Sequence, residues 1–139
     1  MEISISTDKS KLNIEAIHDY LCYKSYWAKG RSFDRVKKSI ENSICFGLYD
    51  NDNRMLGFGR IITDYVVFAY LMDFFIFEEQ QGKGFGTQLA QHIFEYPDLQ
   101  QVRLWFLGTH TAQKFYEKCG FTRVEDPDRF MYKRNVNNL

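Results

Sequence analysis

Three glycines in the segment Gln81-Gly82-Lys83-Gly84-Phe85-Gly86-Thr87 mark the part of the sequence best suited to hold a charged ligand. The segment follows a strand-like run, 74–77, and precedes a helix-like run, 88–94. Glycines at such a junction expose backbone N–H groups at a helix N-terminus, where the helix dipole favours an anion. The pattern therefore predicts a phosphate-binding loop. It matches neither a P-loop nor the dinucleotide fingerprint, which would need a glycine in place of Thr87. The alternative is a glycine turn that only caps a helix.

Two titratable residues could act beside this loop. Asp73 interrupts an otherwise apolar strand, and a buried carboxylate is costly unless it is paired or functional. We predict that it binds or deprotonates a substrate amine, or else pairs with an arginine such as Arg60 or Arg103. The phenol of Tyr116, with an ordinary pKa of about 10, could protonate a leaving thiolate, since a thiol has a pKa of about 8.5. Its alternative role is packing against the sheet.

The wider composition restricts the class of protein. The 139 residues predict a single domain, 1–139, large enough to form a core without metal or disulfide support. Basic and acidic residues number 18 each, so no net field attracts nucleic acid or a membrane surface. The three cysteines have no Cys-x-x-Cys spacing, and we expect no metal site. Neither a signal peptide nor a transmembrane run is evident, so we expect a cytoplasmic protein.

The elements that must position these residues follow from hydrophobic periodicity. The predicted fold class is α/β, with a mixed, mostly antiparallel central sheet of about seven strands and helices on both faces. The strands 66–77 and 102–107 should be parallel, and their junction should open a ligand crevice. Strands are predicted at 3–5, 44–49, 55–63, 66–77, 102–107, 121–124 and 130–133, and helices at 12–21, 33–42, 85–95 and 111–118.

A second motif supports the first. The segment 112–121, Ala-Gln-Lys-Phe-Tyr-Glu-Lys-Cys-Gly-Phe, follows the glycine loop by about 25 residues. Together the two segments resemble the two signatures of the GNAT superfamily of N-acyltransferases, and the resemblance extends over residues 43–134. It implies transfer of an acetyl group from acetyl-CoA to a primary amine, by direct attack through a tetrahedral intermediate.

The resemblance also implies roles for individual residues. Tyr116 would be the general acid, and the loop 23–31 would form the acceptor wall through Tyr26, Trp27 and Arg31. Thr109 stands where the family often has asparagine, which puts one cofactor contact in doubt. The residues implied to bind the cofactor are Phe75, Ile76, Phe77, Gln81, Gly82, Lys83, Gly84, Phe85, Gly86, Thr87, Thr109, Ala112 and Phe115.

Other readings remain open at this point. Glu78 and Glu79 could act as bases through water in place of Asp73. The protein could be a non-catalytic acyl-CoA sensor or interaction module, or it could use the loop to bind a nucleotide. The expected partners are a small-molecule or peptide amine, with no nucleic acid or membrane, and the chain is expected to be a monomer or a homodimer.

Overall fold

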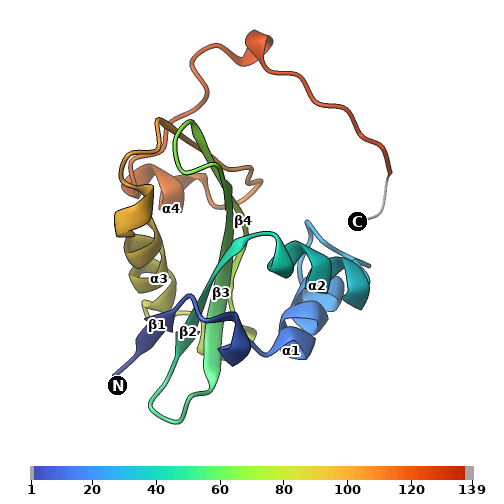
Figure 1. Cartoon of the computed structure of the whole chain (residues 1–139), viewed down its shortest axis with the longest axis vertical. Coiled ribbons are helices and arrows are strands. Elements are labelled where there is room, and N and C mark those ends of the chain that lie inside the picture. The colour runs from blue at the N-terminus through green and yellow to red at the C-terminus, as the bar shows by residue number, and fades with distance from the viewer. Residues whose placement is uncertain (1, 137–139) are drawn as a thin grey trace.

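A single mixed sheet of five strands organises the protein, as the computed structural model shows for residues 2–136 (Figure 1). The strands lie in the order in which they occur in the chain. The first four are antiparallel to their neighbours, whereas β5 is parallel to β4. The strands are β1 (Ser4–Ser6), β2 (Ile44–Tyr49), β3 (Met55–Thr63), β4 (Phe68–Ile76) and β5 (Leu104–Phe106). The predicted fold class is confirmed.

Helices cover both faces of the sheet, each over its own core. On one face lie α1 (Ile14–Asp19), which continues into a π-helical turn (Tyr20–Lys24), and α2 (Phe33–Glu41). On the other lie α3 (Phe85–Phe94) and α4 (Gln113–Lys118), as Figure 1 shows. The first core contains Ile17, Leu21, Val36, Ile40, Phe58 and Phe75, and the second contains Phe46, Leu48, Leu56, Ile61, Leu89 and Ile93.

The helix starts differ in chemistry. Side-chain oxygens of Asn13 and Ser32 accept backbone N–H groups at the starts of α1 and α2, as ordinary N-caps do. The start of α3 is Gly84, which has no side chain to offer. The first N–H groups of α3 are therefore left to another acceptor.

A β-bulge interrupts the pairing of β3 with β4. Met72 pairs with Arg60 and Phe75 pairs with Phe58, so two residues of β4 lie opposite Gly59 alone. The first of these two is Asp73, whose φ of 51° is rare for a residue other than glycine. A Cβ on Gly59 would lie 3.1 Å from the ring of the second, Phe74, so the bulge favours glycine at position 59.

The strands β4 and β5 separate soon after they meet. Their register runs only from Phe68 opposite Leu104 to Tyr70 opposite Phe106, whereas β4 continues to Ile76. The predicted parallel junction is thus present but short. Beyond it the edge of β4 that faced β5 is open, in the position where α/β sheets bind ligands.

The predicted closing pair of strands, 121–124 and 130–133, is wrong for the single chain. Within the part of the chain that the structure describes, the segment after α4 forms no strand, only the 3-10 turn Pro127–Arg129. We call residues 121–136 the C-terminal arm, which runs away from the sheet in Figure 1. The sheet therefore has five strands and not seven. A strand-like sequence forms a strand only where a sheet edge accepts its backbone, and this arm bypasses the edge of β5.

Candidate active site

The glycine loop has the backbone of an anion cradle. Gly82 and Gly84 have φ values of 79° and 84°, in the left-handed region that glycine tolerates best. A Cβ at either position would meet nothing within 4 Å, so the loop surface above them is open to a ligand. The N–H groups of the first turn of α3 follow directly, from Phe85 to Thr87. Backbone donors and helix dipole thus act in the same place.

Two side chains of the loop have distinct roles. The Gln81 side-chain amide donates to the carbonyl of Ile76 over 2.9 Å and so ties the loop to the end of β4. The Lys83 ammonium donates to Gln80 over 3.2 Å and is otherwise exposed. The geometry of the loop therefore depends on Gln81 and the glycines, while Lys83 adds a mobile positive charge at its surface.

Only some of the predicted β4 amides face the opening. The N–H of Phe77 donates to the carbonyl of Leu56 on β3 over 3.0 Å and is already used. Successive residues of a strand direct their N–H groups to opposite sides. The N–H of Ile76 therefore points away from β3, toward the gap left by β5. Among Phe75, Ile76 and Phe77, Ile76 is the amide best placed to meet a ligand in that gap.

Tyr20 lies beside the same end of β4, although the sequence analysis did not select it. Its ring stacks on Phe75 with centroids 4.0 Å apart, and it packs edge-on against Phe77. Its hydroxyl lies 3.5 Å from the side-chain amide of Gln81. Burial raises the pKa of this phenol. Sequence periodicity placed Tyr20 in a helix, but no local pattern could show that the π-helical turn directs it to the glycine loop.

Asp73 is the centre of a buried polar cluster. One carboxylate oxygen accepts the indole N–H of Trp27 over 2.9 Å. The other accepts guanidinium N–H groups of Arg31 over 2.8 Å and Arg60 over 2.6 Å. The carboxylate is 1% exposed, and the two arginine side chains are 9% and 6% exposed. Both oxygens are therefore engaged, away from bulk water.

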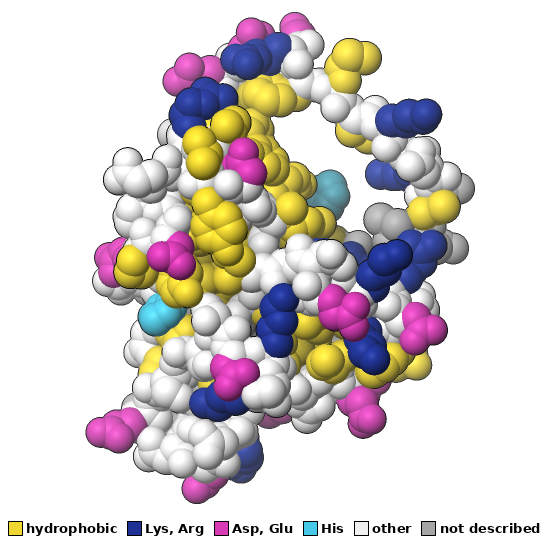
Figure 2. Space-filling model, viewed as in Figure 1, with side chains coloured by type: hydrophobic (Ala, Val, Ile, Leu, Met, Phe, Trp, Pro, Cys, Tyr) yellow, Lys and Arg dark blue, Asp and Glu magenta, His cyan; other side chains and the backbone are white. Residues whose placement is uncertain are grey.

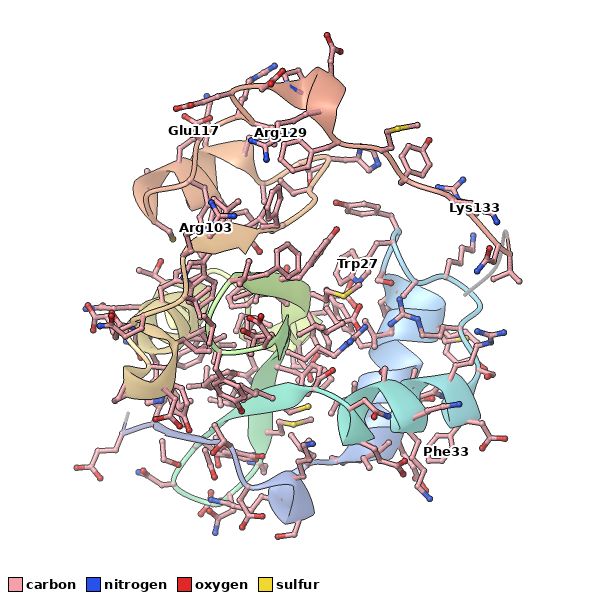
Figure 3. All side chains as sticks on the ribbon, turned by 45° about the horizontal axis from the view of Figure 1, so that its top comes forward. Trp27, Phe33, Arg103, Glu117, Arg129 and Lys133 are labelled. Carbon is pink, nitrogen blue, oxygen red and sulfur yellow. The ribbon has the colours of Figure 1, made fainter. Side chains whose placement is uncertain are left out.

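These contacts favour the arginine-partner alternative for Asp73. Burial alone would raise the pKa of its carboxyl group, but the charges of Arg60 and Arg31 and the hydrogen bonds from Arg60 and Trp27 lower it. A carboxylate with a lowered pKa and no free oxygen is a poor proton acceptor. Of the two arginines suggested by the sequence, Arg60 is the partner, while Arg103 lies on the exposed flank of β5 (Figure 3). Arg31 was predicted to bind substrate, not to pair with Asp73.

The predicted acceptor wall reaches the segment between β5 and α4 through Tyr26. Its hydroxyl accepts the backbone N–H of His110 over 3.0 Å, and its ring packs edge-on against Trp27 at 5.2 Å. Trp27 in turn contacts Asp73 in the bulge. The structure therefore brings Tyr26, Trp27 and Arg31 together with Asp73, although 42 residues separate Arg31 from Asp73 in the chain.

Tyr116 projects from α4 into an aromatic cluster. Its ring packs edge-on against Phe74, Phe115 and Phe121, with centroids 5.1–6.2 Å apart. The contact with Phe74 brings the tyrosine next to the bulge of β4. Burial raises the pKa of the phenol well above its usual range, and the negative charges of Cys119 and Tyr26 in their ionised forms would raise it further. The phenol is therefore neutral at physiological pH.

The remaining predicted cofactor residues form the entry to α4. Ala112 is the N-cap of this helix, and its N–H donates to the hydroxyl oxygen of Thr109 over 3.0 Å. The Thr109 hydroxyl keeps one proton to donate to a ligand. The ring of Phe115 packs on Phe74 with centroids 6.0 Å apart. Position 109 thus organises the helix start even without the asparagine that the family often has there.

The arrangement suits an extended anionic ligand with a reactive group near the bulge. An open strand edge leads from the bulge to a glycine cradle, and the aromatic residues and Asp73 cluster lie at the opposite end. Among the residues that the structure describes, no group of three or more His, Cys, Asp or Glu side chains could hold a metal ion.

Comparisons with known proteins agree with this architecture. Residues 41–123 match the model of the acetyltransferase (GNAT) domain. A candidate acetyltransferase of Gibberella zeae is 34% identical over 146 residues, covering 89% of this chain and 81% of the relative. An uncharacterized N-acetyltransferase of Pyropia yezoensis is 29% identical, covering 91% and 73%. The crystal structure of a candidate GNAT acetyltransferase from Xanthomonas campestris superposes with a TM-score of 0.92 at 36% identity, covering 96% of this chain and 94% of that one.

Fold and comparisons together define a protein of the acetyltransferase class. The chain belongs to the GNAT acetyltransferase family. Within residues 2–136, none of the helices has the length and apolar character that a bilayer span requires.

Proposed function

We propose that this protein transfers the acetyl group of acetyl-CoA to the nitrogen of a primary amine. The observation that carries the proposal is the glycine cradle at the end of β4, where the edge of β4 no longer pairs with β5. The cradle fits a pyrophosphate, and the open strand edge fits the amide-bearing arm of the cofactor, since amides can pair with backbone as a strand would.

The backbone supplies the binding and the charge stabilisation. The first-turn amides from Phe85 to Thr87 hold the pyrophosphate, and the freed edge of β4 orients the thioester. A backbone N–H on this open edge of β4 would face the carbonyl oxygen on which negative charge develops as the amine attacks, while the N–H of Ile76, nearer the glycine loop, would pair with the amide-bearing arm. A single fixed donor of this kind contributes about 10²–10³ to kcat in other acyl-transfer enzymes.

Tyr116 is proposed to return a proton to the sulfur as the carbon–sulfur bond breaks. The new carbon–nitrogen bond forms at the same carbonyl carbon, and the amine loses its proton to solvent. The raised pKa of Tyr116 keeps the phenol protonated, but it also makes the phenol a weaker acid. The transfer therefore requires a direct hydrogen bond to the departing sulfur, where charge appears late in the reaction.

Asp73 is proposed to position the acceptor wall and not to accept the amine proton. Its hydrogen bonds fix Trp27 and Arg31, and both its oxygens are used in doing so. The remaining candidate bases are Glu78 and Glu79, which are exposed near the end of β4. Glu78 is paired with Lys24 over 2.8 Å, so a base role for this pair would operate through water.

To test the proposal, primary amines are screened with acetyl-CoA, and turnover is monitored through the release of free thiol. We expect at least one class of primary amine to give turnover that depends on both substrates. Thermal-shift measurements with CoA, ATP and NAD form a parallel test, in which we expect only CoA to stabilise the protein. Stabilisation by CoA without turnover on any amine would favour the acyl-CoA sensor, and stabilisation by ATP alone would contradict the cofactor assignment.

A further inference from the structure

The C-terminal arm exposes apolar side chains that the rest of the fold would be expected to bury. Met131 is 95% exposed and Tyr132 is 87% exposed. Val124, Phe130 and Val136 are each more than two-fifths exposed. Figure 2 shows an open space between the arm and the body of the molecule. Apolar side chains exposed to this extent, with Met131 and Tyr132 adjacent in the chain, indicate an interaction surface.

The outer edge of β5 is a sheet edge without a strand beside it. Within residues 2–136, the only strand that pairs with β5 is β4. The N–H of Arg103 donates toward β4, to the carbonyl of Val66 over 2.9 Å. By the alternation of a strand, the N–H groups of Leu104 and Phe106 point to the outer side. Exposed edges of this kind recruit additional strands.

A groove of about 900 Å³ runs along this outer edge. β5 and the residues just after it form one side, and the start of the arm forms the other. The groove lies between two extended stretches of chain, and the β5 side provides backbone N–H donors. Its aromatic and aliphatic lining includes Phe94, Leu104, Phe106, Tyr116, Phe121 and Phe130. This is the environment that an apolar strand requires.

The arm leaves the groove of its own chain after Phe130, whose ring packs edge-on against Phe106 with centroids 5.2 Å apart. The backbone hydrogen bonds that its described residues make are local, from Phe121 to Tyr116, from Arg129 to Asp126 and from Phe130 to Pro127. The turn at Pro127–Arg129 directs the chain away from β5. Figure 3 shows the result, with Lys133 far out along the arm and Arg103 at the flank of β5.

We propose that two copies of this chain exchange their arms, so that residues 131–136 of each lie as a strand in the β5 groove of the other. The chain has a strand-like segment that pairs with no sheet, and its sheet has an edge that pairs with no further strand. In a dimer with a two-fold axis, each copy can place its segment beside the free edge of the other. The exchange pairs the outward N–H groups of β5 and covers the apolar side chains of the arm. It also accounts for the second of the two closing strands, 130–133, which the sequence predicts and the single chain does not form.

The first test is the oligomeric state of the full chain by light scattering. We expect a dimer at micromolar concentration. The double variant Met131→Asp, Tyr132→Asp places a charge on both faces of the proposed strand and should raise the dimer dissociation constant at least tenfold. Tyr23→Asp is the matched control, because Tyr23 is 72% exposed and lies outside the arm, and it should leave the dimer intact. A monomeric parent chain, or a double variant that dimerises normally, would overturn the proposal.

A complementation test separates exchange from any other dimer. Leu104→Pro removes an outward N–H of β5 while the arm is unchanged, so this variant has an arm but a damaged groove. The double arm variant has a groove but a damaged arm. Each alone should be mostly monomeric, whereas an equimolar mixture should form a heterodimer through the one intact arm-and-groove contact. Native mass spectrometry distinguishes the species by mass, and absence of the heterodimer from the mixture would refute arm exchange.

Discussion

The two ends of the opening beside β4 are held in place by opposite means. At the bulge end, the Asp73 cluster is fixed by side chains, with three hydrogen bonds from two segments of the chain, residues 27–31 and β3, converging on one buried carboxylate. At the loop end, the glycine loop is fixed by backbone conformation, and the space above Gly82 and Gly84 holds no side chain. The side chains of the first end depend on one another's hydrogen bonds. The second end can accept a ligand because no side chain occupies its surface.

This difference predicts different consequences of substitution. Removing a group from the buried network leaves its partners uncompensated, so folding stability should suffer first. Adding a group to the loop obstructs the ligand, so cofactor affinity should suffer first. Four substitutions and one pH effect test whether the two ends respond in these separate ways. The largest effect is expected for Asp73 and the smallest for the exposed charge of the loop and for pH.

Asp73→Asn should have the largest effect, and mainly on stability. The substitution leaves the buried guanidinium groups of Arg31 and Arg60 without their counter-charge, a change that typically costs about 3–5 kcal/mol. CoA affinity, measured by calorimetry below the melting temperature, should be unchanged. The matched control is Asp50→Asn, at a buried carboxylate that caps the turn before β3. If Asp73→Asn left the melting temperature unchanged but abolished turnover, Asp73 would be a catalytic base after all.

Tyr116→Phe should lower kcat by roughly 10²-fold, the scale of general-acid assistance, with CoA affinity within a few-fold of the parent. The phenylalanine ring keeps the contacts with Phe74 and Phe121, so stability should change little. Steady-state kinetics on the amine identified by the screen provides the measurement. Tyr96→Phe is the control, since Tyr96 is also half-buried among aromatic rings but lies outside the opening. Normal turnover by Tyr116→Phe would mean that water or another group protonates the sulfur.

Gly84→Val should weaken CoA binding at least tenfold, or about 1.4 kcal/mol. Valine disfavours the φ of 84° and places a branched side chain in the space that the ligand would occupy. Gly30→Val separates the two causes, because Gly30 has nearly the same φ and the same open surroundings but lies outside the loop. Calorimetry on both folded variants should find a loss of affinity only for Gly84→Val. Equal affinities would remove the basis for the cradle.

Lys83→Ala should have a smaller effect on CoA affinity, within a few-fold. Its exposed ammonium group adds a screened charge to a site made of backbone donors. Calorimetry at low and high salt should show that this small difference shrinks further as salt rises. A loss as large as that of Gly84→Val would show that side-chain charge, and not backbone, holds the ligand.

The pH dependence of stability should also carry the signature of Asp73. Its pKa is lowered in the folded state, so its contribution to stability is present above the unfolded pKa of about 3.9 and is lost as pH falls below that value. Urea unfolding between pH 5 and pH 2 should therefore show a steeper loss of stability in the parent than in Asp73→Asn. Parallel curves for the two proteins would contradict the lowered pKa.

Much of this organisation could be predicted from the sequence, because it is local. Periodicity located every strand from β1 to β5 and every helix within a few residues, and the glycine spacing identified the loop. Three features depended on tertiary contacts and were missed: the stacking of Tyr20 on Phe75, the second arginine on Asp73, and the failure of the arm to form strands. A strand pattern reports that a segment can pair, but not which edge, or which copy of the chain, provides the partner.

The bulge in β4 has a consequence for how this fold tolerates change. Opposite Gly59 the strand carries one surplus residue, three residues beyond Tyr70, the last residue of β4 that pairs with β5. Deleting the codon for Asp73 would restore the ordinary one-to-one register with Phe75 still opposite Phe58, but it would remove the carboxylate that Trp27, Arg31 and Arg60 share. We therefore expect evolution to keep the extra residue of this strand for the hydrogen bonds that it makes, although the sheet could pair without it.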